Sequence, residues 1–314
     1  MAMRIIFMGT AEIACPMLRA VMGMPGVEVV AAVTQPDRPR GRNLDVEACS
    51  VKVAALALGL PVLTPEKINT SESLAALRVL QPDVIVVVAY GQILREALLQ
   101  LPARGSINVH ASLLPRYRGA APIQWSIARG ETVTGVTTML MNAQMDAGDM
   151  LMQAEVAIGP EDTAGTLQPR LAEAGAALLT QTLTGWVAGN LVPRPQDVGQ
   201  VSFAPKLRKQ DGEIDWTLGA TEIHNRIRGF NPWPGCFCQV PGEGERVLLK
   251  VHRAVVADGA GEPGRVLDVG GNGPLVACGQ GALRLLEVQP PGRKAMGGDA
   301  FLHGRGLKMG ERLG

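Results

Sequence analysis

The sequence is poor in aromatic residues and carries almost no net charge, so neither feature assigns it to a functional class. Aromatic residues make up only 4% of its 314 residues, so aliphatic side chains and Met must fill its cores. The formal net charge is +1, without the strong basic excess of many nucleic-acid-binding proteins. Basic and acidic residues number 16 and 17 up to Lys206 (16 − 17 = −1), and 14 and 12 after it (14 − 12 = +2). Any contact with nucleic acid must therefore depend on local patches.

The sequence also lacks the cysteine spacing of a zinc site and the long apolar run of a membrane span. The five Cys, at positions 15, 49, 236, 238 and 278, are odd in number and lack the spacing of a zinc site. This favours reduced thiols over a disulfide framework. No stretch approaches the roughly 20 apolar residues of a membrane span. The first residues lack the layout of a signal peptide. We therefore expect a cytoplasmic protein without a metal and without a membrane partner.

The loops that usually bind nucleotides are absent as well. The first predicted strand is followed by Gly9-Thr10-Ala11-Glu12-Ile13-Ala14, which has one glycine where the dinucleotide-binding fingerprint needs three. A phosphate-binding loop of the type Gly-x4-Gly-Lys-Ser does not occur either. The sequence thus argues against nicotinamide, flavin or ATP bound by these routes.

Hydrophobic residues make up 46% of the chain, which is enough for buried cores. Over residues 1–188, continuous apolar runs alternate with segments of helical periodicity. The patterns predict strands at 4–9, 28–34, 61–63, 84–90, 107–111 and 135–141. They predict helices at 13–22, 51–58, 71–80, 94–99, 121–129 and 163–187. Such alternation is typical of an α/β domain, here a Rossmann-like and mostly parallel sheet covered on both faces.

The pattern changes in the last third of the chain. Residues 189–206 hold three prolines and little periodicity, which indicates a linker. Residues 207–314 combine one predicted helix at 220–228 with short strands at 236–240, 247–254, 264–269, 275–277 and 283–289. Short strands at near-regular spacing predict a small C-terminal β-barrel of the OB type.

The most informative segment is 106–122, Ser-Ile-Asn-Val-His-Ala-Ser-Leu-Leu-Pro-Arg-Tyr-Arg-Gly-Ala-Ala-Pro. Strand alternation places Asn108 and His110 on one face, at the end of a strand where open α/β sheets bind ligands. An amide can donate to a developing oxyanion, and an imidazole can move a proton near neutral pH. A buried structural Asn and a packing His are the alternatives.

A carboxylate follows in the segment 142–149, Asn-Ala-Gln-Met-Asp-Ala-Gly-Asp. Asp146 next to the imidazole could hold its tautomer and charge. Asp149 is the competing choice, and Asp before Gly is also common in ordinary turns. The spacing does not decide between the two.

Two further features of predicted loops bear on ligand binding: the segment around Pro115 and the alternating arginines. Pro115 keeps Leu114 out of a helix, so residues 112–115 could form one wall of an apolar pocket or an ordinary loop. Arginines alternate at 38, 40 and 42 and again at 116 and 118. Arginine suits phosphate, although a solvated surface explains such residues equally well.

Taken together, the motifs resemble the methionyl-tRNA formyltransferases, a branch of the folate-dependent formyltransferase family, over essentially the whole chain. The segment 107–124 marks the wider family. The other matching segments are 4–10, 34–39, 86–94, 146–150, 214–216, 230–235 (Phe-Asn-Pro-Trp-Pro-Gly) and 289–296 (Gln-Pro-Pro-Gly-Arg-Lys-Ala-Met). The last two narrow the resemblance to the tRNA branch.

The resemblance implies transfer of a formyl group from 10-formyltetrahydrofolate to the α-amino group of methionine on initiator tRNA, without a metal. It implies a catalytic domain at 1–188, a tRNA-binding domain at 207–314 and a monomer. The implied catalytic residues are Asn108, His110 and Asp146. The implied folate contacts are Ser112, Leu113, Leu114 and Pro115, with Val88, Tyr90, Gln92 and Asn142 at the pterin edge.

One loop departs from the family pattern. After Pro-Asp-Arg-Pro the family often has a longer insertion with paired lysines, whereas this chain has Arg-Gly-Arg-Asn-Leu-Asp at 40–45. Contact with tRNA would then depend on Arg38, Arg40 and Arg42, and on cations of the C-terminal part: Lys206, Arg208, Lys209, Arg293, Lys294 and Lys308. An alternative keeps the same first domain but formylates a small amine such as an amino-sugar nucleotide. A third hypothesis is a non-catalytic RNA-binding protein with a relic formyltransferase domain. The presence of Asn108, His110 and Asp146 speaks against it.

Overall fold

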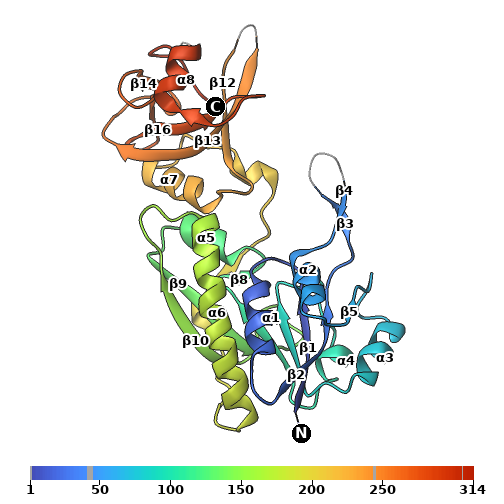
Figure 1. Cartoon of the computed structure of the whole chain (residues 1–314). Coiled ribbons are helices and arrows are strands. Elements are labelled where there is room, and N and C mark those ends of the chain that lie inside the picture. Colours follow the sequence, from blue (N-terminus) through green and yellow to red (C-terminus); the bar gives the residue numbers. More distant parts are fainter. Residues whose placement is uncertain (1, 41–44, 243–244, 306) are drawn as a thin grey trace. The chain divides into compact units, whose positions relative to one another are not determined.

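A computed structural model describes residues 2–40, 45–242, 245–305 and 307–314 (Figure 1). The chain forms two compact units. The first unit contains Met1–Gly119, Val133–Ala157 and Gln168–Ala204. The second unit contains Ala120–Thr132, Ile158–Leu167 and Pro205–Gly314. Segments of the amino-terminal half thus contribute to both units.

The first unit is built on a seven-stranded sheet of order β10-β9-β7-β6-β1-β2-β5. Its parallel part consists of β1 (Met3–Gly9), β2 (Val27–Val33), β5 (Val62–Leu63), β6 (Val84–Val88) and β7 (Ser106–His110). The antiparallel edge consists of β9 (Val133–Leu140) and β10 (Met150–Ala157). β6 and β7 are buried at every residue, as expected for central strands covered on both faces. The predicted fold class, a mostly parallel α/β sheet, is confirmed.

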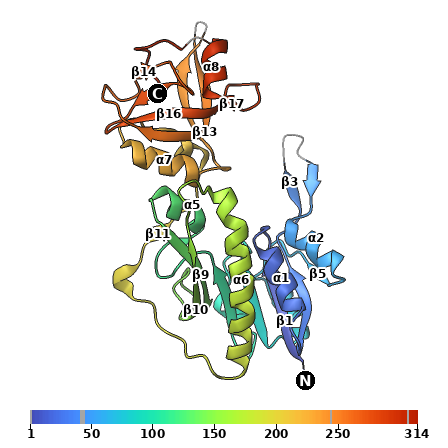
Figure 2. The ribbon, with the colours of Figure 1, turned by 60° about the vertical axis from the view of Figure 1, so that its left-hand side comes forward.

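Helices lie along the sheet where the periodicity predicts them: α1 (Ala14–Met22), α2 (Ser50–Ala57), α3 (Ser71–Val79), α4 (Glu96–Leu99) and α6 (Ala164–Val187) (Figure 1). Figure 2 shows α1 and α6 in front of the strands. One predicted strand is too long. The pattern predicts extended backbone over residues 84–90, but β6 ends at Val88, because Ala89 and Gly91 turn the chain with φ of 45° and 92°. The turn redirects residues 89–92 along the carboxyl edge of the sheet.

Two short pairings complete the first unit. β3 (Arg38–Arg40) and β4 (Asp45–Glu47) form a hairpin that the sequence pattern does not predict. β8 (Arg118–Gly119) pairs in parallel with β11 (Phe203–Ala204), which lies inside the predicted linker. A 3-10 turn, η1 (Val198–Gln200), precedes β11. The segment 189–206 is therefore bonded to the first unit over part of its length, rather than being a free tether.

The second unit is mainly an antiparallel sheet of β12 (Cys236–Pro241), β13 (Arg246–Ala257), β16 (Ala282–Gln289), β15 (Leu275–Ala277) and β14 (Val266–Asp268), with β17 (Met296–Gly297) on β16. Its helical elements are α5 (Pro122–Ala128), η2 (Lys209–Gly212), α7 (Ala220–Gly229) and α8 (Gly298–Arg305). The sequence pattern does not predict β10, β17 or α8.

The core of the second unit draws on residues far apart in the sequence. Ala121 and Ala128, at the two ends of α5, are buried in one cluster with Ile223 and Ile227 of α7. The Trp125 ring meets the Phe230 ring edge-on at 5.5 Å between centroids, a favoured aromatic geometry. The single helix α5 thus joins the C-terminal core, although the chain enters and leaves it from the first unit.

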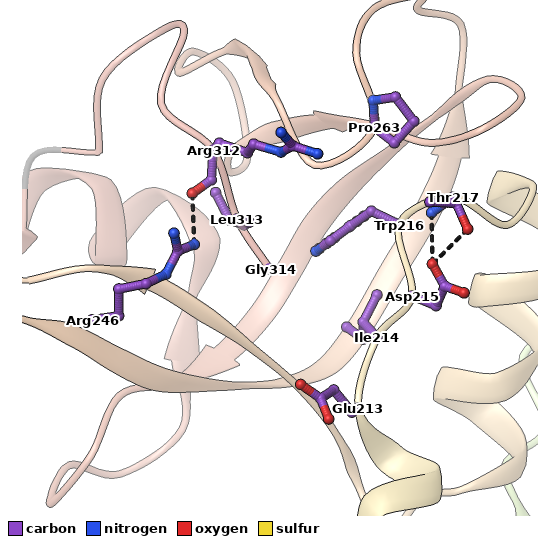
Figure 3. A pocket seen from close by; sticks show the side chains of 10 residues that line it. All are labelled: Glu213, Ile214, Asp215, Trp216, Thr217, Arg246, Pro263, Arg312, Leu313 and Gly314. Carbon is purple, nitrogen blue, oxygen red and sulfur yellow. Dashed lines mark hydrogen bonds between the residues drawn. The ribbon is translucent and has the colours of Figure 1, made fainter.

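A cavity of about 590 Å³ lies within the second unit (Figure 3). Its lining includes Trp216, Arg246 and Arg312. The Arg246 guanidinium donates to the Arg312 carbonyl at 3.0 Å, and the buried Trp216 Nε1 has no hydrogen-bond partner. None of the lining residues belongs to the predicted catalytic set. Among the described residues, no helix is long and apolar enough to span a bilayer.

Candidate active site

The candidate site lies at the carboxyl end of β7. Asn108 and His110 are 8% and 6% exposed, so both are buried beside neighbouring strands β6 and β9. Asn108 pairs with Val87 on one side and Met139 on the other through the sheet register. Within the described part of the chain, no hydrogen bond engages the Asn108 side-chain amide. Neither polar atom of this amide is fully buried, so the amide is accessible to a ligand.

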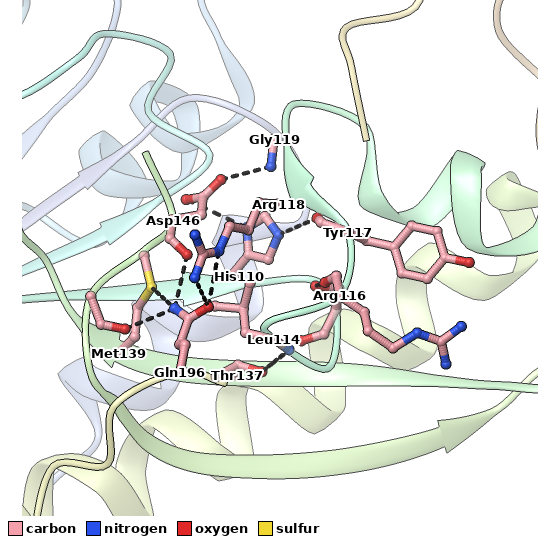
Figure 4. Close-up of polar contacts among 12 residues, drawn as sticks. His110, Leu114, Arg116, Tyr117, Arg118, Gly119, Thr137, Met139, Asp146 and Gln196 are labelled. Atoms are coloured by element: carbon pink, nitrogen blue, oxygen red, sulfur yellow. Dashed lines mark hydrogen bonds and ion pairs between the residues drawn. The ribbon is translucent and has the colours of Figure 1, made fainter. Parts of the chain in front are cut away.

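Two oxygen atoms face the two ring nitrogens of His110 (Figure 4). Nε2 lies 2.9 Å from the backbone oxygen of Tyr117, and Nδ1 lies 3.8 Å from Oδ1 of Asp146. Both oxygens are acceptors. A proton on Nε2 can be donated to the Tyr117 oxygen, whereas the Asp146 carboxylate lies beside Nδ1 beyond hydrogen-bond distance.

The structure brings Asp146, rather than Asp149, to the imidazole. The Asp146 side chain is only 16% exposed, and its Oδ2 accepts a hydrogen bond of 2.8 Å from the Gly119 amide. Asp149 is exposed, and its backbone oxygen accepts from Leu140 at the base of the loop. Asp146 also has a φ of 49°, a left-handed conformation that is uncommon outside glycine. Surrounding contacts must hold such a residue in place.

The loop 112–115 is held by its own polar groups. Ser112 Oγ donates to the Arg116 oxygen at 2.6 Å, and the Leu114 amide donates to Thr137 Oγ1 at 3.0 Å. Gln153 donates to the Leu114 oxygen at 2.9 Å. Pro115 is buried, and Leu113 is half-buried over Gly135, where an added Cβ would come within 2.6 Å of the leucine. The Ser112 hydroxyl therefore shapes this loop, and Leu113 supplies apolar surface.

The residues predicted for the pterin edge lie in two loops. Val88 ends β6, and Tyr90 is 2% exposed; burial raises the pKa of its hydroxyl to about 12. Gln92 accepts from the Ile68 amide at 2.9 Å and donates to backbone oxygens of residues 65 and 66, so its side chain fixes that neighbouring loop. Asn142 is exposed in the Asp146 loop and accepts from the Gln144 amide at 2.9 Å.

The predicted tRNA contacts are spread over both units. Arg38 in β3 is exposed and lies 3.8 Å from Glu66, and the backbone of Arg40 pairs with Asp45. Arg42 lies outside the described residues. The predicted tRNA-contacting residues of the second unit are all exposed: Lys206, Arg208, Lys209, Arg293, Lys294 and Lys308.

Sequence reasoning missed several residues of the site. The backbone of Tyr117 and Gly119 holds His110 and Asp146, and the side chain of Gln196 in the predicted linker bonds to the Asp146 loop. The only available signal was the proximity of Tyr117 and Gly119 to His110 in the sequence, and none pointed to Gln196. No group of three or more His, Cys, Asp or Glu side chains that could hold a metal occurs in the described ranges.

Comparison with known proteins defines the class. A family model for formyl transferase matches residues 3–183, and one for the formyl transferase C-terminal domain matches residues 206–306. The chain belongs to the formyltransferase family. Within it, the chain is 48% identical over 312 residues to the methionyl-tRNA formyltransferase of Geobacter sulfurreducens, covering 99% of this chain and 97% of that protein. It is equally 48% identical to that of Moorella thermoacetica, with 99% of each chain covered.

Solved structures show the same fold at lower identity. WlaRD, a sugar 3N-formyltransferase, has a TM-score of 0.67 and 17% identity, covering 94% of this chain and all of that one. HypX from Aquifex aeolicus in complex with tetrahydrofolic acid has a TM-score of 0.60 and 16% identity, over 97% of this chain and 47% of that one. At such identity the likeness concerns the fold, and does not favour a sugar as the acceptor.

Proposed function

We propose that this chain transfers the formyl group of 10-formyltetrahydrofolate to the α-amino group of methionyl initiator tRNA, in preparation for translation initiation. The observation that carries this proposal is the identity of 48% across both family domains with proteins named methionyl-tRNA formyltransferase. The site geometry supports it, because acyl transfer needs an oxyanion donor and a proton carrier side by side.

The proposed role of Asn108 and His110 is to stabilise the tetrahedral intermediate. The amine nitrogen attacks the formyl carbon, and the carbonyl oxygen becomes negatively charged. The unengaged Asn108 amide and the Nδ1–H of His110 would donate to this oxygen, because Nε2 already faces the Tyr117 oxygen. One such donor typically contributes about 3–4 kcal/mol to the transition state.

The proposed role of Asp146 is to hold His110 charged and to remove the proton from the attacking nitrogen, directly or through a water. The intermediate collapses when the bond between the carbon and N10 of the folate breaks, and N10 receives the proton that Asp146 took from the amine. The amide product and tetrahydrofolate result. The Nδ1–Oδ1 separation of 3.8 Å supports this role, because it places the carboxylate next to the ring without a tight direct bond.

The loops around the trio support the proposed folate site. The loop 112–115 offers Leu113 and Pro115 as an apolar wall. Residues 88–92, at the end of β6, and Asn142 offer backbone and amide groups for the pterin edge. We propose that Ser112, Leu114 and Gln92 act there by shaping the loops, since their polar groups bond within the protein.

The remaining parts of the proposal concern how tRNA is bound, the oligomeric state and the location in the cell. Residues 1–188 would carry out the chemistry and residues 207–314 would bind tRNA, with 189–206 between them. The exposed cations Lys206, Arg208, Lys209, Arg293 and Lys294, together with Arg38, Arg40 and Arg42, would contact phosphates. We propose a cytoplasmic monomer, because all three proposed catalytic side chains come from a single chain.

The test is a transfer assay with formyl-labelled 10-formyltetrahydrofolate and two acceptors. Methionyl initiator tRNA should be formylated, and uncharged tRNA provides the control for transfer to the amino acid. Amino-sugar nucleotides are offered in parallel. Turnover of the sugar nucleotide without transfer to the charged tRNA would overturn the proposal.

A further inference from the structure

One side chain in the predicted linker connects the two loops that hold the proposed catalytic pair. Gln196 Nε2 donates to the backbone oxygen of Asp146 at 2.9 Å and to that of Gly148 at 2.8 Å. Its Oε1 accepts from Arg118 Nε at 3.0 Å and from Arg118 Nη2 at 2.7 Å. The amide makes these four hydrogen bonds and a fifth, long one of 3.9 Å from Nε2 to the Met139 sulfur (Figure 4). Asp146 and Arg118 are 50 and 78 residues away in the sequence.

The chemistry of these bonds requires an amide. The two hydrogens of Nε2 meet two carbonyl oxygens, and Oε1 meets a guanidinium that can only donate. A carboxylate would oppose the two carbonyls, and an apolar side chain would bind neither partner. Gln196 is half-buried, whereas Pro195 and Asp197 on either side are exposed. The linker therefore turns this side chain inward, toward the Asp146 loop.

The bonds hold a conformation that the chain would not adopt freely. Asp146 has a φ of 49°, in the left-handed region, which disfavours it by roughly 1 kcal/mol or more. Gly148 packs so closely under β9 that only a hydrogen fits in place of a Cβ, next to the Leu140 oxygen. Gln196 bonds to the turn on both sides of Ala147. It thereby fixes the direction in which the Asp146 carboxylate leaves the loop.

The linker holds the other half of the site as well. Ser202 Oγ accepts from the Tyr117 amide at 2.9 Å, and the Ser202 oxygen accepts from the Arg118 amide at 2.8 Å. Tyr117 presents its oxygen to His110, and Gly119 presents its amide to Asp146. Gln196 and Ser202 therefore act on both members of the pair through their immediate neighbours.

We infer that Gln196 is a positioning residue for formyl transfer, which sets the Asp146 carboxylate against His110 by bonding the 146–148 turn to Arg118. This inference rests on the proposed catalytic role of Asp146. Gln196 acts on the turnover step and does not bind either substrate. Through Gln196 and Ser202 the linker supports the proposed catalytic pair, in addition to connecting to the second unit.

The test compares two glutamines of the same linker. Gln196→Met removes all of these bonds at nearly constant size. Gln200→Met is the matched control, because Gln200 is exposed and, among the described residues, its side chain bonds to Asp197 of the same turn alone. We expect Gln196→Met to lower kcat roughly 10- to 100-fold, as small misplacements of reacting groups do, with the KM for folate and for tRNA within about twofold. Gln200→Met should leave both parameters unchanged.

A double-mutant cycle with Asp146→Asn tests whether Gln196 acts by orienting the Asp146 carboxylate or by stabilising the surrounding structure in general. If Gln196 acts through the carboxylate, Gln196→Met should cost little more, under about twofold, once Asp146→Asn has removed that group. Should Gln196→Met not fold, as judged by thermal unfolding, Gln196→Glu replaces it, because it keeps the bond to Arg118 and turns the donation to the two carbonyls into repulsion.

Three outcomes overturn the inference. An unchanged kcat in Gln196→Met contradicts it directly. An equal loss with and without Asp146→Asn shows a bracing role unrelated to the carboxylate. Full activity of Asp146→Asn alone removes the catalytic role on which the inference rests, and this result identifies the proposed function as the part that fails.

Discussion

The proposed catalytic side chains and the proposed tRNA-contacting side chains are held in opposite ways. His110 and Asp146 are nearly enclosed, and each faces specific partner atoms: the Tyr117 oxygen for His110, the Gly119 amide for Asp146, and each other. The cations at 206, 208, 209, 293 and 294 are exposed on the second unit. Fixed geometry is what a reacting group requires, whereas a phosphate contact requires mainly charge. Substitutions in the two sets should therefore differ in the kinetic constant that they change.

The largest expected effect is at His110. His110→Ala should lower kcat for formyl transfer by about 10²- to 10⁴-fold, the range associated with a positioned proton-transfer group. His303→Ala is the control, because His303 is exposed on α8 and, within the described ranges, its ring bonds just to the Asp299 oxygen of its own helix. Steady-state kinetics measure both variants. Unchanged turnover of His110→Ala would remove the contrast between the two sets.

The next effect is at Asn108. Asn108→Ala should lower kcat by roughly 10²- to 10³-fold, because it removes one oxyanion donor. Because the amide bonds to no group in the described structure, the substitution should leave the thermal unfolding midpoint within a few degrees. A large loss of stability with little loss of kcat would assign Asn108 to packing instead.

A smaller effect concerns the backbone that supports the site. A Cβ at Gly148 would lie 1.6 Å from the Leu140 oxygen, so Gly148→Ala must displace the Asp146 loop. We expect a loss of about 1–3 kcal/mol in the free energy of unfolding, together with reduced kcat. Gly304→Ala is the control from α8 in the second unit, where an added Cβ meets nothing within 4 Å. Helix propensity predicts a gain of up to about 1 kcal/mol there.

The smallest effect is expected for the exposed cations. Replacing Arg293 and Lys294 together by Ala should raise the KM for tRNA severalfold and leave kcat unchanged. The slope of the logarithm of binding against the logarithm of salt concentration should become shallower by about one for each phosphate that is no longer neutralised. Lys67→Ala, an exposed cation of the first unit outside the proposed set, gives a comparison for general charge. A kcat effect of the double substitution would show that the two sets are not separate.

The sequence predicted the parallel sheet and most helices because long apolar runs and helical periodicity are local signals. It did not predict β10, whose residues alternate between partly buried and exposed, or the β3–β4 hairpin of three-residue strands. The strand end at Val88 was also missed, because the turn at Ala89 uses a positive φ that nothing in Val-Ala-Tyr-Gly signals before Gly91. Short or strained elements depend on tertiary contacts that no local pattern contains.

The candidate site was predictable to a similar degree. Asn108 and His110 followed from strand alternation, but the choice between Asp146 and Asp149 needed the chain to fold back on itself. The partners Tyr117 and Gly119 contribute only backbone groups, which any residue type provides. Gln196 and Ser202 lie in a proline-containing stretch without periodicity, so their inward direction could be seen only in three dimensions.

The pairing of the linker with the loop at 117–119 has a consequence for biosynthesis. The bonds from Gln196 reach back 50 residues to Asp146 and 78 residues to Arg118, so the site includes long-range contacts. Contacts of that span form late, because the intervening chain must first be closed into a loop. On the ribosome the central strands can assemble as they emerge, whereas the candidate site at their ends reaches its final form only after residues 196–204 have been synthesised. A nascent chain arrested before that point would carry the sheet without a completed site.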